Sequence, residues 1–409
     1  MNNTELKSKT GSPAGEENEF FGRENELNSL IDKVTRGDHP SIFAPRRVGK
    51  TSLMRRAKKV LEEKGNMCFL CDLEGKTPAK LIHELYKYML ESKDIKKTTI
   101  TVSFLKNFFI NLAGKDLTDL EKISTLDSGQ WSNLGDEILK ILCNSCPDGK
   151  RFVIFLDELG VMIHTMQKEL PKESRRTEAH KEVKGFIEWL RSIRQVESTK
   201  KISLVIASSI GLHPLLKRLK LSADINDLTT FTLDAWEPEI AKESILALAR
   251  GKKIEILPET AERMTEMIGW CAPYYVQVFF DSAYDNLFCK KREPHSVEDL
   301  SKIYDKYLIR GNDISPALSH MFERLAESLS EQEFALAKLI LNKLAQNDGV
   351  TAKSEIKSVK NKSKNKIDEE TIINVLDILE HDGYIEAVDN GYRFLSNILR
   401  DWWRNKYGN

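Results

Sequence analysis

The spacing of apolar and polar residues changes along this chain. It predicts an α/β part followed by a mostly helical part. Up to about residue 233, short apolar runs between polar turns alternate with segments whose apolar residues follow helical spacing. Alternating strands and helices are typical of a parallel sheet covered by helices. The runs that predict strands lie at about residues 39–43, 67–72, 152–158, 202–209 and 228–233.

The strand predicted at 152–158 has the clearest pattern. It begins with five consecutive apolar residues, Phe152 to Leu156, and ends with Asp157 and Glu158. A continuous apolar run of this kind is typical of a strand buried on both faces. The pattern therefore predicts an α/β fold with a parallel sheet and with two carboxylates at the carboxyl end of an inner strand.

From Asp234 onward the pattern becomes helical. Segments 241–249 and 261–268 have the spacing of amphipathic helices. Pro273 follows a glycine turn, at a position that suits the first turn of another helix. These segments predict a helical lid over residues 236–325.

The last part of the chain, residues 326–409, has the pattern of a separate module. A hairpin is predicted over 384–394, because Asn390-Gly391 is a strong two-residue turn signal. Three helices and a β-hairpin make a winged-helix domain. The helices are predicted at about 330–345, 352–360 and 368–381.

Composition and charge exclude several classes of function. Lys and Arg number 62, as do Asp and Glu, so the net charge is zero and a global basic field for nucleic acid is absent. No stretch approaches the roughly 20 apolar residues of a membrane span, and residues 1–7 lack the apolar core of a signal peptide. We therefore expect a cytoplasmic protein without a membrane contact. Residues 1–18 are polar and predict a disordered tail.

Two cysteine pairs, Cys68/Cys71 and Cys143/Cys146, have the C-x-x-C spacing of zinc sites. The interval between the pairs is far wider than in a zinc ribbon. Moreover, Cys68 and Cys71 lie in a predicted strand, where residues three apart point to opposite faces. We therefore expect buried cysteines that pack as small apolar side chains.

The candidate chemistry begins directly after the first predicted strand. Residues 44–51 have the sequence Ala-Pro-Arg-Arg-Val-Gly-Lys-Thr, which closely matches the phosphate-binding loop G-x-x-x-x-G-K-[ST] between a strand and a helix. Lys50 would reach the β- and γ-phosphates of ATP, and the Thr51 hydroxyl would bind Mg²⁺. Ala44 replaces the first glycine, which is tolerable if Ala44 keeps a strand-like φ. The loop residues predicted to bind nucleotide are Pro45, Arg46, Arg47, Val48, Gly49, Lys50, Thr51 and Ser52.

Asp157 and Glu158 supply the second half of a nucleotide site, because open α/β sheets bind ligands at the carboxyl ends of their strands. Asp157 is predicted to hold the Mg²⁺ shell in the role of a Walker-B aspartate. Glu158 is predicted to orient or deprotonate the attacking water. A helix cap after a core strand is the alternative role for both carboxylates, and the phosphate loop upstream makes it less favoured.

The strand predicted at 202–209 ends in Ser208 and Ser209. A hydroxyl at this position can sense the γ-phosphate or the attacking water. Alternatively, one serine caps the helix that begins near Gly211. The sequence leaves the choice between the two serines open.

The predicted recognition helix of the winged-helix domain runs from Asp368 to Glu380 and carries five carboxylates but no Lys or Arg. Such a helix would set like charges against the phosphates of DNA. The loop before it is rich in lysine, and such a run is usually solvated. A protein contact is therefore favoured over recognition of bases. The lysines are Lys353, Lys357, Lys360, Lys362, Lys364 and Lys366.

Several motifs carry a family resemblance: Phe21-Gly22-Arg23-Glu24-x-Glu26-Leu27, residues 44–52, 155–158, 207–209 and 273–275, and the terminal winged helix. Together they resemble archaeal-type ATPases of the STAND class, which are signal-transduction ATPases related to AAA+ proteins. The resemblance covers about residues 19–409. It implies a P-loop NTPase core over residues 19–235, followed by the lid and the winged-helix domain.

The resemblance also implies roles for single residues. Phe21, Gly22 and Arg23 would lie near the base and the ribose, and Pro273 would contact adenine from the lid. Exchange of ADP for ATP would open the lid, and the winged helix would hold the closed, inactive state. An arginine finger is not identifiable, although Arg191 and Arg194 are candidates because they precede the 202–209 strand.

The expected function is an ATP-binding and ATP-hydrolysing regulatory switch, with ATP, ADP and Mg²⁺ as ligands. Its nucleotide state would control homo-oligomerisation or a protein effector partner, in a stress or defence module by analogy with the family. One alternative is a DNA-binding ATPase that resembles Orc-type replication initiators. Another is a nucleotide-binding scaffold without turnover, against which Glu158 argues. Residues 93–130 are not assigned a role.

Overall fold

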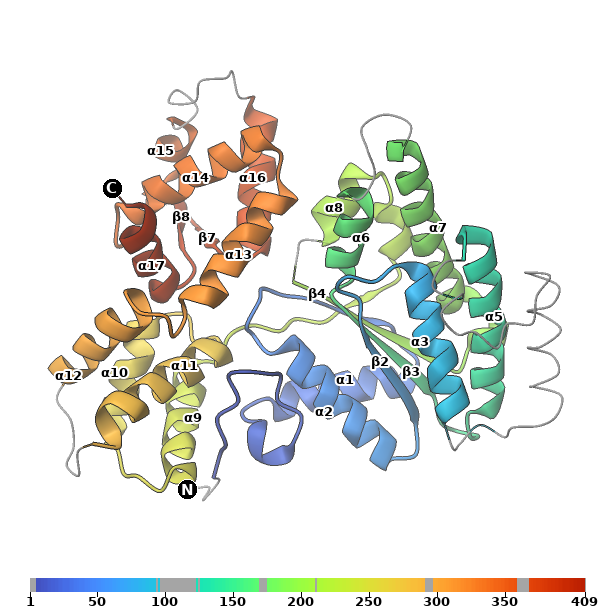
Figure 1. Cartoon of the computed structure of the whole chain (residues 1–409), viewed down its shortest axis with the longest axis horizontal. Helices are drawn as coiled ribbons and strands as arrows, with labels where there is room; N and C mark the ends of the chain where they lie inside the picture. The colour runs from blue at the N-terminus through green and yellow to red at the C-terminus, as the bar shows by residue number, and fades with distance from the viewer. Residues whose placement is uncertain are drawn as a thin grey trace. The chain divides into compact units, whose positions relative to one another are not determined.

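The chain forms two compact units in a computed structural model that describes residues 5–92, 95, 123, 126–168, 175–209, 212–290, 297–358 and 368–408 (Figure 1). The sheet unit comprises Asn25–Phe43 and Met54–Thr232. The lid unit comprises Met1–Glu24, Ala44–Leu53 and Leu233–Asn409. Most of the unassigned segment 93–130 and the lysines from Lys360 to Lys366 lie outside the described residues.

A five-stranded parallel sheet forms the centre of the sheet unit, with the strand order β2-β3-β4-β1-β5. All residues of β3 and β4 are buried, as the continuous apolar pattern predicts. The α/β fold class is thereby confirmed. The strands are β1 (Pro40–Phe43), β2 (Met67–Asp72), β3 (Phe152–Asp157), β4 (Ile202–Ser208) and β5 (Thr229–Thr230).

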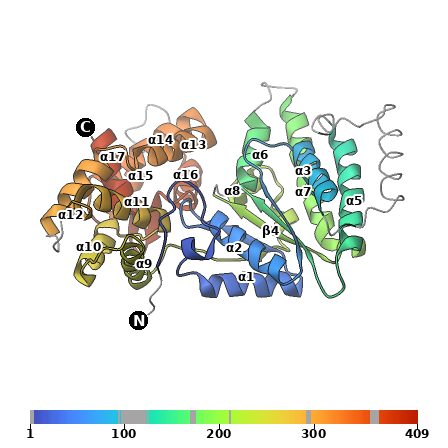
Figure 2. The ribbon, with the colours of Figure 1, turned by 60° about the horizontal axis from the view of Figure 1, so that its bottom comes forward.

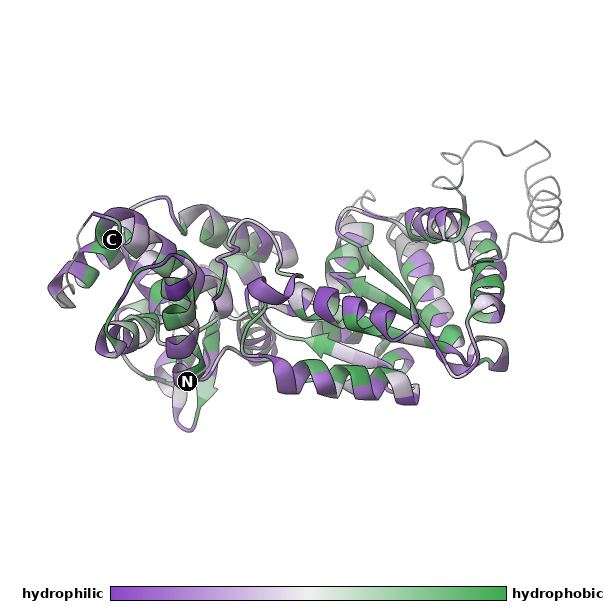
Figure 3. Ribbon diagram, turned by 90° about the horizontal axis from the view of Figure 1, so that it is seen from below, coloured by the Kyte–Doolittle hydropathy of each residue, from purple (hydrophilic) through white to green (hydrophobic). Residues whose placement is uncertain are grey.

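Helices cover both faces of this sheet (Figure 2). Ile154 and Leu156 of β3 pack in an apolar cluster with α3, α5, α6, α7 and α8. On the other face, the Ser203 hydroxyl of β4 donates to the Val34 carbonyl of α1 at 3.0 Å. Figure 3 shows the apolar strands between helices whose outer faces are hydrophilic. The helices are α1 (Glu24–Arg36), α2 (Lys50–Glu63), α3 (Pro78–Glu91), α5 (Ser128–Ser145), α6 (Leu159–Lys168), α7 (Arg175–Gln195) and α8 (Leu212–Arg218).

The edge strand β5 is shorter than predicted. The pattern predicts a strand at about 228–233, whereas β5 contains Thr229 and Thr230 alone. The predicted length is wrong: among the described residues β5 pairs with β1 alone, and this pairing covers only Thr229 and Thr230, opposite Pro40 and Ser41.

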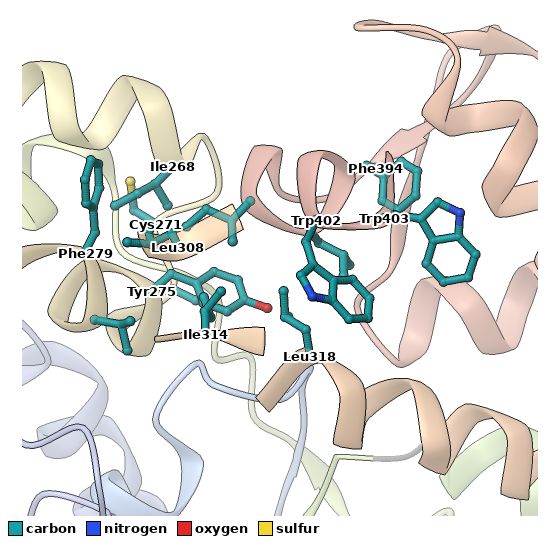
Figure 4. Packing of buried hydrophobic residues seen from close by; sticks show 14 of the residues in the cluster. Ile268, Cys271, Tyr275, Phe279, Leu308, Ile314, Leu318, Phe394, Trp402 and Trp403 are labelled. Carbon is teal, nitrogen blue, oxygen red and sulfur yellow. The ribbon is translucent and has the colours of Figure 1, made fainter. Parts of the chain in front are cut away.

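The lid unit is held by one apolar cluster that extends from the lid helices into the C-terminal part. Figure 4 shows Tyr275 and Phe279 in the same cluster as Trp402 and Trp403. The boundary predicted between residues 325 and 326 is therefore not a boundary between compact units. Sequence periodicity shows that each helix has an apolar face, but not which other element covers that face.

The C-terminal part has the helices and the hairpin where the pattern predicts them. A small antiparallel sheet has the order β6-β8-β7, and Asp389 and Asn390 form the turn between β7 and β8. The elements of the lid unit are α9 (Pro238–Gly251), α10 (Pro258–Ile268), α11 (Pro273–Ala283), α12 (Val297–Ile303), α13 (Ser315–Ser328), α14 (Glu331–Ala345), β6 (Thr351–Ala352), α15 (Lys353–Ser358), α16 (Glu369–His381), β7 (Ile385–Val388), β8 (Gly391–Phe394) and α17 (Asn397–Tyr407).

The start of the chain is packed against the lid unit. Leu6 is 2% exposed, and its N–H donates to the Ala247 carbonyl of α9 at 3.1 Å. The prediction of a disordered tail over residues 1–18 is therefore wrong for the described residues 5–18. The segment is mostly polar, but it contains two apolar residues that are buried, Leu6 and Ala14, and backbone groups that form hydrogen bonds with α9 and α11.

None of the helices in the described part of the chain combines the length and the apolar character that crossing a membrane requires.

Candidate nucleotide-binding site

The loop at 44–51 has the backbone of an anion-binding turn. It follows β1 directly, and helix α2 begins at Lys50. Gly49 has a φ of +99° and Arg47 a φ of +72°, whereas Ala44 keeps a negative φ and needs no glycine. Backbone N–H groups in such a turn converge on one point and favour negative charge. A left-handed backbone costs a residue such as Arg47 about 1 to 3 kcal/mol, and strain of this kind gathers at functional sites.

The Lys50 side chain folds back onto the start of this loop. Its ammonium group donates to the Ala44 carbonyl at 2.7 Å and to the Pro45 carbonyl at 2.8 Å, and the residue is 5% exposed. The lysine predicted to bind phosphate is thus already turned over the loop that would hold the phosphate.

A residue of the lid packs on the same loop. The guanidinium of Arg47 lies 4.2 Å from the centre of the Tyr274 ring. The Tyr274 N–H also points at the Arg47 carbonyl, at 3.5 Å. Tyr274 follows Pro273, the first residue of α11. The sequence prediction missed this contact, although the Pro-Tyr-Tyr motif that supports the family resemblance contains the residue.

The segment that follows α16 also lies against the loop. A Cβ atom added to Gly383 would lie 2.6 Å from the Cβ atom of Pro45. Near this contact, Arg46 Nη2 and Tyr384 Oη are buried without a hydrogen-bond partner in the described part of the chain. Burial raises the pKa of the Tyr384 hydroxyl well above its usual range. The C-terminal part therefore contributes to the surroundings of the loop.

The segment Phe21-Gly22-Arg23 joins the loop to the start of α9. Arg23 Nη2 donates to the Val48 carbonyl at 3.4 Å and to the Asp234 carbonyl. Phe21 packs edge-on against Trp236, with ring centres 6.3 Å apart. All residues predicted to bind the nucleotide, from Phe21 through the loop to Pro273, thus belong to the lid unit.

The carboxyl end of β3, in the sheet unit, holds the two predicted acidic residues. Asp157 is 3% exposed, and its Oδ1 accepts the Glu158 N–H at 3.0 Å. Glu158 has a left-handed φ of +57°. Its Oε2 accepts the Ser209 hydroxyl at 2.6 Å and the Ser209 N–H at 3.1 Å. We call Asp157, Glu158, Ser208 and Ser209 the acidic edge.

Strand order places the serines centrally in this sheet edge. β4 lies between β1 and β3, so Ser208, the last residue of β4, and Ser209, which follows it, lie between the ends of the loop strand and the acidic strand. Ser208 is paired with Phe43, the last residue of β1, and the loop begins at the next residue. The two serines therefore differ: Ser209 contacts Glu158, whereas Ser208 is aligned with the strand that leads into the loop.

Comparison with known proteins places this architecture in a family. A family model described as an ATPase domain predominantly from Archaea matches residues 20–256, more than half of the chain. The chain belongs to this ATPase family. A search among curated proteins gave no match.

Solved structures agree on the fold of this ATPase. A Walker-type ATPase of Pyrococcus abyssi has a TM-score of 0.65 and 18% identity, over 96% of this chain and 99% of that chain. The ORC2 protein of Aeropyrum pernix, solved as ADPNP-ADP complexes, has a TM-score of 0.55 and 12% identity, over 97% of this chain and 96% of that chain. Family membership makes the hydrolysis of ATP the reaction of this chain.

The arginines considered as fingers for this ATPase are held on their own unit. Arg194 donates to both carboxylate oxygens of Asp227, at 2.6 and 2.8 Å, and its side chain is 1% exposed. Arg191 donates to Asp224 at 2.8 Å. A buried, bidentate arginine does not reach outward, so Arg194 is unsuited to the role of an arginine finger.

Proposed function

We propose that this ATPase is a nucleotide-dependent regulatory switch of the STAND type. The observation that carries the proposal is that three distant segments contact the phosphate loop. Arg23 donates to Val48, Tyr274 packs on Arg47, and Gly383 lies against Pro45. A ligand shifts a conformational equilibrium only through contacts that differ between the two states. A nucleotide on this loop would alter contacts shared with the lid and the C-terminal part.

The proposed chemistry assigns one role to each residue of the loop and the acidic edge. Lys50 binds the β- and γ-phosphates, and Glu158 orients or deprotonates the attacking water. Thr51 and Asp157 offer the oxygen ligands that suit Mg²⁺. Bound Mg²⁺ would neutralise charge on the phosphates. Ser209 positions Glu158, and Ser208 is the candidate sensor of the γ-phosphate.

The binding of the base and the ribose is assigned to the segment around Phe21 and to Pro273. Phe21, Gly22 and Arg23 precede α1, and Pro273 opens α11. The loop residues from Pro45 to Ser52 complete the proposed nucleotide site. These assignments follow from the family, and their support is that all of these residues belong to one compact unit.

The output is proposed to be a contact with an effector protein or with a second copy of the chain, in the cytoplasm. The C-terminal part is proposed to be a winged-helix domain, and the support is its helices α14, α15 and α16 and the hairpin of β7 and β8. The five carboxylates on or next to α16 are exposed, and they disfavour the phosphate backbone of DNA. They are Asp368, Glu369, Glu370, Asp377 and Glu380.

The test is nucleotide content and ATP turnover on one preparation, with and without double-stranded DNA. Wild type is compared with Glu158→Gln and with Glu188→Gln, a matched change at an exposed position of α7. We expect retained ADP, slow turnover that DNA does not change, and a loss of about 100-fold or more in Glu158→Gln alone.

The same experiment separates the alternatives. Turnover that appears only with DNA would replace the switch by a DNA-dependent ATPase of the initiator type. Nucleotide binding without turnover would make the chain a scaffold. Equal activity of Glu158→Gln and wild type would remove the acidic edge from the catalytic site.

A further inference from the structure

Residues 5–19, which we call the strap, lie before the first residue matched by the ATPase family model. The strap is fixed to α9 at Leu6, whose side chain is buried in the apolar cluster of the lid unit. The Leu6 carbonyl approaches Gly251 so closely that a Cβ atom there would lie 2.1 Å from its oxygen. The glycine that ends α9 therefore makes room for the strap.

The strap is also fixed to α11. The Lys9 N–H donates to Gln277 Oε1 at 2.7 Å, and the Ser8 hydroxyl donates to Asp281 Oδ2 at 2.6 Å. Gln277 and Asp281 are four residues apart, so they lie on the same face of the helix. Lys9 and Glu19 form an ion pair at 2.8 Å, which joins the two ends of the strap. In Figure 1 this dark blue segment runs beside α9 and α11.

The other end of the strap reaches the helix of the phosphate loop. Ala14 is 8% exposed, and its N–H donates to the Ser52 hydroxyl at 3.0 Å. Ser52 lies in the first turn of α2, directly after Lys50 and Thr51. The strap thus contacts the lid helices and the loop helix within a few residues.

The strap is short enough to limit movement. Lys9 and Ala14 are five residue steps apart, and an extended chain of that length spans about 18 Å at most. While both hydrogen bonds hold, this span, together with the two hydrogen bonds and the side chains that make them, limits how far α11 can lie from Ser52. An opening of the lid that exceeds this limit must therefore break the Ala14 contact or the contact with α11.

We propose that the strap fastens α9 and α11 to the phosphate loop and thereby sets the rate at which a nucleotide leaves the loop. The proposal rests on the proposed function, because it takes the loop to be the nucleotide site. In this device the strap positions the loop helix and does not contact the reacting atoms.

The test measures the release of ADP that carries a methylanthraniloyl fluorophore, chased with unlabelled ADP. Gly251→Ala displaces Leu6 but leaves the amino-acid sequence of the strap unchanged. Because alanine is a better helix former than glycine, α9 itself is not weakened. Gly185→Ala in α7 is the matched control, since a Cβ atom there has open space. Leu6→Ala and Ser8→Ala loosen the strap from its own side.

We expect release about tenfold faster in Gly251→Ala and Leu6→Ala and about threefold faster in Ser8→Ala, since each loses packing or a hydrogen bond of ordinary strength. Trypsin cleavage at Lys7 and Lys9 should accelerate in the same variants. Release that stays within twofold of wild type while cleavage accelerates would overturn the strap proposal alone. If wild type binds no labelled ADP, the proposed function fails and the strap proposal fails with it.

Discussion

The phosphate loop and the acidic edge are assigned to one reaction, yet different kinds of contact hold them. The acidic edge ends strands that are buried along their whole length, with Leu156 paired to Ile206 in register. The loop is held by isolated contacts from segments far away in the sequence, such as Tyr274 and Gly383. The hydrogen bonds between paired strands open cooperatively, whereas an isolated contact can be lost without the others. We therefore expect the loop to change its contacts on ligand binding more readily than the acidic edge does.

The largest effect is expected from a change that breaks the surroundings of the loop. Gly22 has a φ of +62°, and a Cβ atom there would lie 2.5 Å from Ile240 Cγ2. Gly22→Ala combines backbone strain with overpacking and should lower the free energy of unfolding by about 4 kcal/mol, measured by urea denaturation. Gly75→Ala has a similar positive φ but open space, so a loss of only about 1 kcal/mol is expected. Equal losses in both variants would mean that the contact with Ile240 is unimportant.

A second prediction concerns how the free energy of unfolding depends on pH through His39, a residue of the sheet unit. His39 Nδ1 accepts the Leu204 N–H at 3.1 Å, and burial, with Arg194 nearby, lowers the pKa of His39 to about 4. Because the unfolded chain binds this proton more readily, stability should be constant above about pH 6.5 and fall between pH 6.5 and 4, by up to about 3 kcal/mol.

His39→Gln keeps an acceptor but does not titrate in this range. Urea unfolding of wild type and His39→Gln, compared at pH 7 and pH 4.5, measures the difference. An identical loss of stability in the two proteins would show that other groups cause the acid sensitivity.

A third prediction sharpens the role of the acidic edge. Ser209→Ala removes the 2.6 Å hydrogen bond to Glu158 Oε2 and leaves the backbone donor in place. We expect kcat to fall about tenfold, with little change in KM, because in the proposed mechanism Glu158 acts on the attacking water and not on substrate binding. Steady-state ATPase kinetics measure the separate changes in kcat and KM, and Ser203→Ala, at a buried serine of β4, is the control. A change in KM alone would contradict a positioning role.

The smallest effect is expected where the loop meets the lid. Tyr274→Leu removes the cation–π contact with Arg47, which is worth about 0.5 to 1 kcal/mol at a partly exposed site. The affinity for ADP should change by about threefold, whereas Tyr274→Phe should retain wild-type affinity. Titration of both variants with labelled ADP measures the difference. Equal affinity in Tyr274→Leu would show that this contact does not couple the lid to the loop.

The strands and the motif residues could be predicted because local patterns determine them. A run such as Phe152 to Leu156 suits the inside of a parallel sheet, and carboxylates that follow it lie at the sheet edge. The same holds for the loop at 44–51, because its glycine and lysine form a recognisable phosphate-binding motif between a strand and a helix. For these elements, the chemistry of neighbouring residues is sufficient.

Tertiary structure alone decided which segments hold the loop. Gly383 belongs to no motif, and the motif that contains Tyr274 does not reveal its partner, yet both residues contact the loop from hundreds of positions away. The contact of Ser209 with Glu158 also depends on β4 being the neighbour of β3. Periodicity records the face that a residue presents, but the partner that covers that face follows from the packing of the whole chain. The sequence by itself therefore indicated the family and the candidate chemistry of this ATPase, and the folded chain determined what its phosphate loop contacts.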